Sequence, residues 1–159
     1  MLWRLYRLRA MGASEILYRV QQAIQAQRES YGIGLARPID PVGYAGRPWL
    51  NELPRGFDTV LYCEAADRVL AGCYDVFALQ DVELGFPPQW NRDCRTGTLA
   101  PLVFGKTLNY RDEKKVGDSK YLWEINRHAE LVTLAQALNL TGQAKYVEGC
   151  RVLLDSWFD

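Results

Sequence analysis

The C-terminal part of the chain, residues 118–159, has the hydrophobic periodicity of two helices joined by a short turn. In the first helix the apolar positions recur every three or four residues, at Leu122, Ile125, Ala129, Val132 and Ala135. Asp118 or Ser119 is suited to cap its start, and Gly142 suits the left-handed position that commonly ends a helix. The pattern therefore predicts a helical hairpin.

The second helix of this hairpin is amphipathic. Its apolar stripe consists of Tyr146, Cys150, Leu153 and Trp157, widened by Val147, Leu154 and Phe158. Its charged side consists of Lys145, Glu148, Arg151 and Asp155. Because such a stripe must be buried against another surface, we expect the hairpin to pack on further helices.

The two halves of the first helix differ in polarity. Residues 131–140 are apolar on nearly all sides, which predicts cover by more than one neighbour. The N-terminal turns instead gather polar and aromatic residues, namely Lys120, Trp123, Glu124, Asn126, Arg127 and His128. An inner helix in a ring of helical hairpins would have this polarity, because neighbours pack its middle while one end opens onto a cleft.

Residues 1–30 form a basic, amphipathic segment. Its arginines, Arg4, Arg7, Arg9, Arg19 and Arg28, outnumber Glu15 and Glu29. We favour a helix that docks its apolar side onto the domain through Leu2, Leu5, Leu8, Ile16, Leu17 and Val20, and the alternative is a membrane-surface or transit helix. The arginines interrupt any apolar core of a secretory signal peptide, so none is predicted, and export by another route stays open.

Between these helices the predicted structure is less regular. The glycines and prolines of residues 31–56 predict a long irregular loop. Apolar spacing then predicts a helix from Phe57 to about Cys73, with Glu64 placed four residues before Arg68. The weaker alternation of residues 74–84 fits a short hairpin or an extended segment. Loops are predicted at residues 85–91 and 93–97.

Composition narrows the classes of function. The chain has 48% hydrophobic and 24% charged residues, which is ordinary for one folded domain. Its formal net charge of +0 argues against a nucleic-acid-binding surface, and no apolar run reaches the roughly 20 residues of a transmembrane helix. The four cysteines, Cys63, Cys73, Cys94 and Cys150, contain no C-x-x-C pair and accompany a single histidine, so neither a metal site nor a cofactor is expected.

Four stretches of the sequence resemble one family. KYLWEINRHAELVTLAQALNLTG, which begins at Lys120, is similar to the N-terminal region of the heparinase II/III family of bacterial polysaccharide lyases, and its WEINRH block is the most specific part. ADRVLAGCYDVFALQDVELG and PPQWNRDCRTGTLAPLVFGKTLNYRD look like the family's preceding segment, in the same order. The opening LWRLYRLRAMGASEILYRV looks like the start of members that lack an export signal.

The resemblance implies a mainly α fold, with helical hairpins forming part of an incomplete α/α toroid, long irregular loops and at most a short β-hairpin. The expected organisation is an N-terminal helical segment at 1–30, a loop at 31–56 and the first part of the toroid at 57–159. In the family the toroid precedes a β-sandwich, and the enzyme cleaves uronic-acid polysaccharides, such as glycosaminoglycans, by β-elimination. By default the location is cytoplasmic, whereas the resemblance suggests the periplasm.

That reaction needs a group that neutralises the uronate carboxylate, a base that removes the C5 proton and an acid for the leaving oxygen. The family's catalytic Asn, Tyr and His residues lie in later motifs, an Asn-His and a Gly-Tyr-His element among them, and neither element occurs in this chain. We therefore expect no catalytic residue here and an N-terminal fragment that is inactive alone. Its expected partners are an acidic polysaccharide and the remainder of its own polypeptide.

The polar end of the first helix supplies most candidate residues for substrate binding. His128 has two interpretations, a sugar contact or a structural hydrogen bond, and Glu124 is placed to set its tautomer. Basic side chains suit sugar carboxylates or sulfates, although pairing with Glu124 or Glu130 is an alternative, and a tryptophan suits either sugar stacking or helix packing. The candidates are His128, Asn126, Arg127, Trp123, Glu124, Lys120, Trp90, Asn91 and Arg92.

Trp90, Asn91 and Arg92 follow two prolines in a predicted loop, where they serve either as binding residues or as a polar clasp. The lyase hypothesis places Asn126, Arg127 and His128 near Trp90, at one open end of the hairpin layer. The alternative hypothesis is a non-catalytic helical-repeat module of the tetratricopeptide kind. Such a module repeats its pattern at about 34 residues, and this sequence contains the pattern once.

Overall fold

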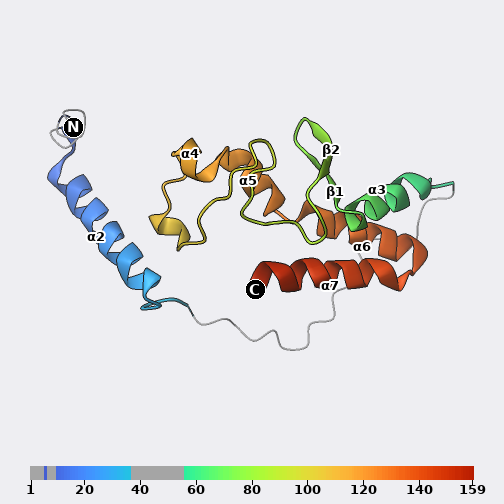
Figure 1. Cartoon of the computed structure of the whole chain (residues 1–159). Coiled ribbons are helices and arrows are strands. Elements are labelled where there is room, and N and C mark those ends of the chain that lie inside the picture. The colour runs from blue at the N-terminus through green and yellow to red at the C-terminus, as the bar shows by residue number, and fades with distance from the viewer. Residues whose placement is uncertain (1–5, 7–9, 37–55) are drawn as a thin grey trace. The chain divides into compact units, whose positions relative to one another are not determined.

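A computed structural model describes residue 6 and residues 10–36 and 56–159 of the chain (Figure 1). The apolar positions predicted at Leu2, Leu5 and Leu8, and most of the predicted loop at 31–56, lie outside these residues. Within them the chain is mainly α-helical and contains one two-stranded antiparallel sheet, in agreement with the prediction of a mainly α fold with at most a short β-hairpin. The described residues divide into two units.

The first unit contains residues 10–36 and 103–108. Its main element is α2 (Ala13–Ser30), which confirms the helix predicted near the N terminus, and the short 3₁₀ helix η1 (Gly105–Thr107) lies against it. An ion pair between Lys106 and Glu29 joins the two. α2 has no buried residue. No helix in the described part of the chain is both long enough and apolar enough to cross a membrane.

The second unit contains residues 56–102 and 109–159 and begins with a helix and a hairpin. α3 (Val60–Leu70) is shorter than predicted, and Gly72 then turns the chain with a φ of 83°. A Cβ atom at Gly72 would lie 2.8 Å from the backbone carbon of Gly85, so this close approach requires glycine. β1 (Cys73–Val76) and β2 (Leu79–Glu83) pair antiparallel, which confirms the short hairpin.

Four further helices complete the second unit. They are α4 (Glu113–Val116), α5 (Ser119–Ile125), α6 (Ala129–Thr141) and α7 (Ala144–Phe158). The Asp118 side chain accepts a hydrogen bond from the Lys120 amide, and Gly142 adopts a φ of 67°, so the predicted cap and the predicted stop are both confirmed.

The prediction of one continuous helix before Gly142 is wrong, because the chain breaks between α5 and α6. His128 adopts a left-handed conformation with a φ of 57° immediately before α6, which a continuous right-handed helix excludes. The Asn126 side chain donates to the Leu122 carbonyl at 2.8 Å and so supplies a hydrogen bond to one of the last carbonyls of α5, which have no partner within the helix. The apolar spacing continues across the break, which explains why periodicity alone misses it.

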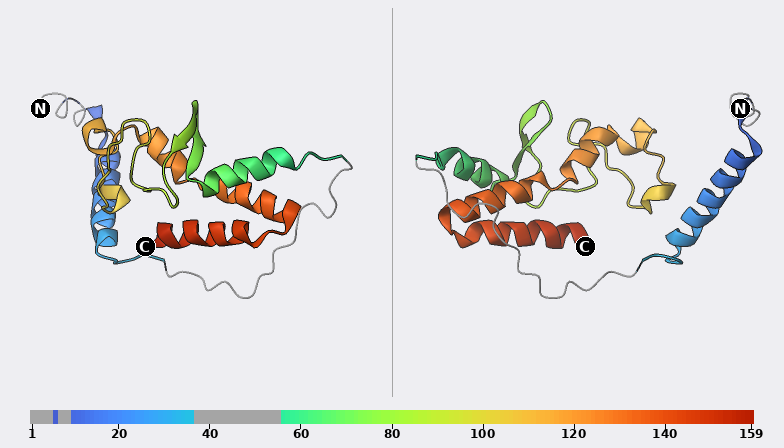
Figure 2. Two further views of the ribbon diagram at one scale, coloured as in Figure 1. Left: turned by 45° about the vertical axis from the view of Figure 1, so that its right-hand side comes forward. Right: turned by 180° about the vertical axis from the view of Figure 1, so that it is seen from behind.

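The core of the second unit lies where α6 packs between α3 and α7 (Figures 1 and 2). Leu134 of α6 and Leu153 of α7 are completely buried. Gly149 lets α7 approach closely, because a Cβ atom there would lie 2.5 Å from Leu70 of α3 and 3.3 Å from Leu134. The buried cluster consists of Ala66, Val69, Tyr74, Val76, Ile125, Leu134, Ala137, Tyr146 and Leu153.

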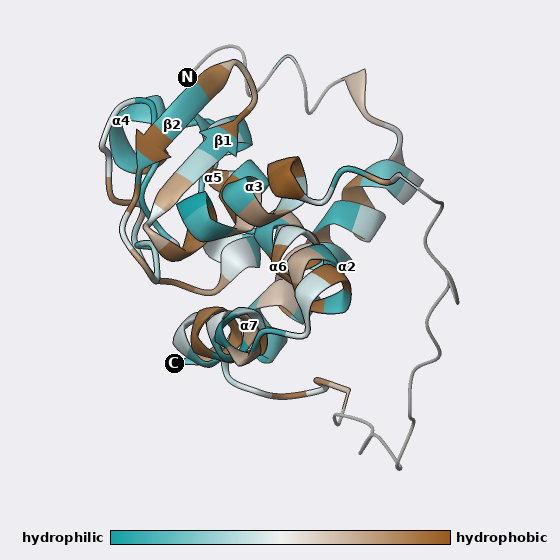
Figure 3. Cartoon of the chain, turned by 90° about the vertical axis from the view of Figure 1, so that its right-hand side faces the viewer, coloured by the Kyte–Doolittle hydropathy of each residue, from teal (hydrophilic) through white to brown (hydrophobic). Residues whose placement is uncertain are grey.

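The apolar stripe predicted on α7 is only partly buried. Tyr146 and Leu153 face the core, whereas Val147, Leu154 and Phe158 remain exposed. Figure 3 shows hydrophobic and hydrophilic positions together along α7. α6 is covered by two neighbours, α3 and α7, as predicted, although Val132 remains 60% exposed.

Candidate functional site

The start of α5 is fixed by a buried carboxylate in the preceding loop. Asp93 is completely buried and accepts hydrogen bonds from the Thr96 hydroxyl, the Arg95 amide at 3.0 Å and the Asp118 amide at 2.8 Å. Gly117 leaves room for it, since a Cβ atom there would lie 2.4 Å from the Asp93 carboxylate oxygen Oδ2. Asp93 thus joins the 93–98 loop to the residue that caps α5.

Hydrogen bonds outweigh burial in setting the pKa of Asp93. Burial alone would raise the pKa of this carboxyl, but the donors from Thr96, Asp118 and Arg95 hold it below the ordinary value. Asp93 is therefore a structural anion. Nothing beyond the local Asp-x-x-Thr-Gly pattern of residues 93–97, which suits a side-chain-stabilised turn, could have pointed to this role from the sequence.

Asn126 connects three segments of the second unit, namely the loop at Trp90, α5 and α7, and we call this connection the clasp. Its amide nitrogen donates to the carbonyls of Trp90 and Leu122, both at 2.8 Å, and its amide oxygen accepts from the indole of Trp157 at 3.0 Å. The Trp90 indole donates to the Ser156 hydroxyl at 3.0 Å and strengthens the same connection. Because these contacts use both donors and the acceptor of the amide, Asn126 has a structural role in this geometry.

His128 lies between two tryptophans in this clasp. Its ring centroid is 5.0 Å from that of Trp90 and 5.0 Å from that of Trp157, and its side chain is 18% exposed. Asn126 and His128 therefore lie near Trp90, as predicted, whereas Arg127, the third residue of that prediction, has its side chain 72% exposed and pairs with Glu124. The enclosure favours the structural interpretation of His128 over a direct sugar contact.

The partner of His128 is Glu130, and the expected contact with Glu124 is wrong. Nδ1 of His128 lies 3.2 Å from Oε1 of Glu130, whereas Nε2 is buried and has no partner. Burial raises the pKa of Glu130, and the nearby His128 partly offsets that effect. Glu124 instead lies 3.4 Å from Arg127, which is one of the pairings considered from the sequence.

The side chains at the exposed face of α5 form a different environment. Trp123 is 55% exposed and its ring centroid lies 5.8 Å from that of Tyr110, which is 46% exposed. The guanidinium carbon of Arg111 lies 5.6 Å from the Tyr110 ring centroid. Lys120 is exposed one helical turn before Trp123, and Arg127, whose side chain is 72% exposed, lies in the turn that follows the end of α5 at Ile125. We call Tyr110, Arg111, Lys120, Trp123 and Arg127 the α5 surface.

The α5 surface combines two exposed aromatic rings with three basic side chains. An exposed indole or phenol ring offers an apolar face to a flat ligand such as a pyranose, and guanidinium groups bind carboxylates or sulfates through parallel hydrogen bonds. Tyr110 and Arg111 are not among the candidates chosen from the sequence, which therefore missed their place beside Trp123. Their position just before α4 and α5 gave no indication of it.

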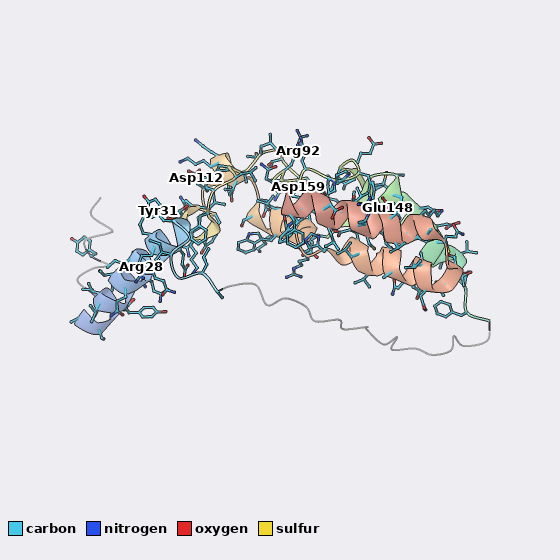
Figure 4. The ribbon with its side chains drawn as sticks, turned by 90° about the horizontal axis from the view of Figure 1, so that it is seen from below. Arg28, Tyr31, Arg92, Asp112, Glu148 and Asp159 are labelled. Carbon is cyan, nitrogen blue, oxygen red and sulfur yellow. The ribbon has the colours of Figure 1, made fainter. Side chains whose placement is uncertain are left out.

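The remaining candidates lie on the loop before α5. The Asn91 side chain donates to the Ala100 carbonyl at 2.8 Å, and the backbone of Arg92 forms a bridge with Leu99. These contacts support the polar-clasp interpretation of the loop. Arg92 itself is exposed on the loop surface (Figure 4). The structure does not bring Asn91 or Arg92 into the α5 surface.

Other residues fill structural roles. Arg68 forms ion pairs with Asp75 at 2.6 Å and with Asp81 at 2.8 Å on the β-hairpin, so its predicted pairing with Glu64 is wrong. All four cysteines are free and partly buried. Among residues 10–36 and 56–159, no group of three or more His, Cys, Asp or Glu side chains is placed to hold a metal ion.

Comparisons with protein-family models, with curated proteins and with solved structures find no match to this chain. The function therefore has to be argued from the residues and from the geometry of the second unit.

Proposed function

We propose that the second unit is a substrate-contacting helical part of a bacterial uronic-acid polysaccharide lyase of the heparinase II/III kind. The resemblance of the WEINRH region to that family is the first support for the proposal. The observation that carries it is the α5 surface, where the exposed rings of Trp123 and Tyr110 lie together and Arg111 lies beside Tyr110.

The chemistry of this surface suits an acidic sugar chain. The rings of Trp123 and Tyr110 offer apolar area to the C–H face of a pyranose, while Lys120, Arg111 and Arg127 supply positive charge for carboxylates or sulfates. Arg127 lies 3.4 Å from Glu124 through Nε, and its side chain is 72% exposed. Since the cations are exposed, their attraction for an anionic polymer should weaken as salt is added.

In this proposal the chain binds and positions the polymer, and β-elimination is performed by groups in the family's later motifs. The structural roles of Asn126 and His128 agree with that division, because both side chains are engaged in the clasp. α3, α6 and α7 would belong to the incomplete toroid. The exposed Val147, Leu154 and Phe158 of α7 would then pack against a neighbouring hairpin of the ring.

The test is the affinity of the chain for acidic oligosaccharides, measured by titration calorimetry at low ionic strength. Heparan sulfate and alginate oligosaccharides should bind, and a neutral dextran oligosaccharide of equal length should not. Trp123→Ala should weaken binding about fivefold, because an aromatic contact of this kind contributes about 1 kcal/mol. Phe158→Ala removes an aromatic ring that is 77% exposed on α7 and serves as the matched control.

Two results would overturn the proposal. One is equal affinity for the acidic and the neutral oligosaccharides, since the charges of the α5 surface would then have no role. The other is an unchanged affinity in Trp123→Ala. With any of these polymers, the chain should produce no ultraviolet absorbance of an unsaturated uronate. Turnover would show that the catalytic groups lie in this chain and not in the family's later motifs.

A further inference from the structure

Arg111 lies against the aromatic pair of the α5 surface. Its guanidinium carbon is 5.6 Å from the ring centroid of Tyr110, and that centroid is 5.8 Å from the ring centroid of Trp123. The first distance is typical of a cation–π contact and the second of an aromatic contact. The three side chains therefore form a continuous row, which begins at the indole and ends at the guanidinium.

The other two basic side chains of the α5 surface have different surroundings. Nε of Arg127 lies 3.4 Å from Oε2 of Glu124, so that carboxylate competes with any bound anion for the guanidinium. Lys120 carries a compact ammonium on a flexible stem, which cannot present the planar pair of donors that a guanidinium offers to a carboxylate. Arg111 thus combines a planar donor group with the support of an aromatic ring.

All three side chains of the row are accessible to a ligand. Trp123 is 55% exposed, Tyr110 is 46% exposed, and Arg111 is exposed as well. The carboxylate that follows Arg111 in the chain, that of Asp112, lies 3.8 Å from Lys115, which offsets its charge. A sugar ring can therefore lie against the indole while a carboxylate of the same chain binds the guanidinium.

We propose that Arg111 determines the preference of the α5 surface for acidic over neutral sugar chains by binding a uronate carboxylate, and that Tyr110 is the residue that positions its guanidinium. This inference rests on the proposed function and names the residue that gives it specificity. A side chain loses conformational freedom when a ligand immobilises it, and a guanidinium already held against a ring has less freedom to lose. Arg111 should therefore contribute more to affinity than Lys120 or Arg127.

The first test measures the affinity of the full chain for an alginate hexasaccharide, which carries carboxylates and no sulfate, by titration calorimetry at low ionic strength. Arg111→Gln should weaken binding about fivefold, which is the upper range for an exposed charge pair, whereas Lys120→Gln and Arg127→Gln should each weaken it by less than about twofold. Arg151→Gln makes the same chemical change on α7, where the side chain is 62% exposed, and should bind as the unaltered protein does.

A double-mutant cycle tests the positioning role of Tyr110. Tyr110→Leu removes the ring that supports the guanidinium, so in this background Arg111→Gln should weaken binding by less than about twofold. Tyr110→Phe keeps the ring and should restore most of the affinity that Tyr110→Leu loses. Additive losses at the two positions would overturn the positioning role, because a merely structural role of Tyr110 would not change the effect of Arg111→Gln.

The outcomes separate this inference from the proposed function. A loss in Arg111→Gln no larger than that in Lys120→Gln, with Trp123→Ala still weakening binding, would overturn the inference and leave the proposed function standing. If the hexasaccharide does not bind the unaltered protein, or binds equally well after Trp123→Ala, the proposed function fails and the inference fails with it.

Discussion

Replacing Asp93 by asparagine should destabilise the second unit strongly. The carboxylate accepts three hydrogen bonds with two oxygens, at the Arg95 amide, the Asp118 amide and the Thr96 hydroxyl. An asparagine side chain has only one acceptor oxygen and no charge, so at least one buried donor loses its partner and the remaining bonds weaken. An unsatisfied buried donor costs about 1–3 kcal/mol and a bond to a charged group contributes about 1.5–3 kcal/mol, which gives a total loss of about 3 kcal/mol.

The loss can be measured by thermal and urea denaturation followed by far-ultraviolet circular dichroism. For a unit of about 100 residues, a loss of about 3 kcal/mol lowers the melting temperature by about 12–24 °C. Asp112→Asn is the matched control, because the Asp112 side chain makes no capping hydrogen bond at the start of α4 and lies 3.8 Å from Lys115, so its replacement should change stability by less than about 0.5 kcal/mol. Equal effects of the two substitutions would refute the role assigned to Asp93.

The pH dependence gives an independent check. The pKa of Asp93 is lower in the folded protein than the ordinary value of 3.8, so this group contributes stability above that value and loses the contribution as the pH falls through the folded-state pKa. The difference in unfolding free energy between the unaltered protein and Asp93→Asn should therefore shrink as the pH is lowered below 3.8. A difference that stays constant down to the acid transition would refute the reasoning.

Substitutions at Asn126 and Gly142, each with a comparison variant, test the ends of α5 and α6. Asn126→Asp replaces the donor of two carbonyl contacts by a carboxylate oxygen, and should cost about 2–4 kcal/mol in urea denaturation, whereas Asn139→Asp at an exposed position of α6 should be nearly neutral. Gly142→Ala should cost about 1–2 kcal/mol because the φ of 67° is unfavourable for a residue with a Cβ atom, whereas Gly142→Asn should cost less. Similar losses of stability for Gly142→Ala and Gly142→Asn would mean that the left-handed backbone conformation does not explain the need for glycine at this position.

The sequence predicted the elements whose causes are local. Asp118 caps α5 through the amide of Lys120, two residues away, and Gly142 ends α6 through its own backbone conformation. The hairpin of β1 and β2 and the position of α7 likewise follow from nearby residues. Such features depend on side chains within one or two turns, and pattern analysis detects them.

Features that depend on distant partners could not be predicted in this way. Asp93 acts on Asp118, and the clasp joins Trp90 and Asn126 to Trp157 on another helix. The break at His128 preserves the apolar spacing on both sides, so periodicity continues through it. The sequence placed the candidate site at the polar end of the first helix. Its division into an internal clasp and an exposed α5 surface required the structure.

The most direct test of the central claim is to follow the indole N–H signals of the second unit by NMR while an acidic uronate hexasaccharide is added. The indoles of Trp90 and Trp157 donate to Ser156 and Asn126, whereas Trp123 lies in the exposed α5 surface. The proposal predicts that the Trp123 signal shifts saturably, that added salt reverses the shift, and that the other two signals stay in place. A shift of Trp90 and Trp157 with Trp123 unmoved would contradict it, because the polymer would then contact the clasp.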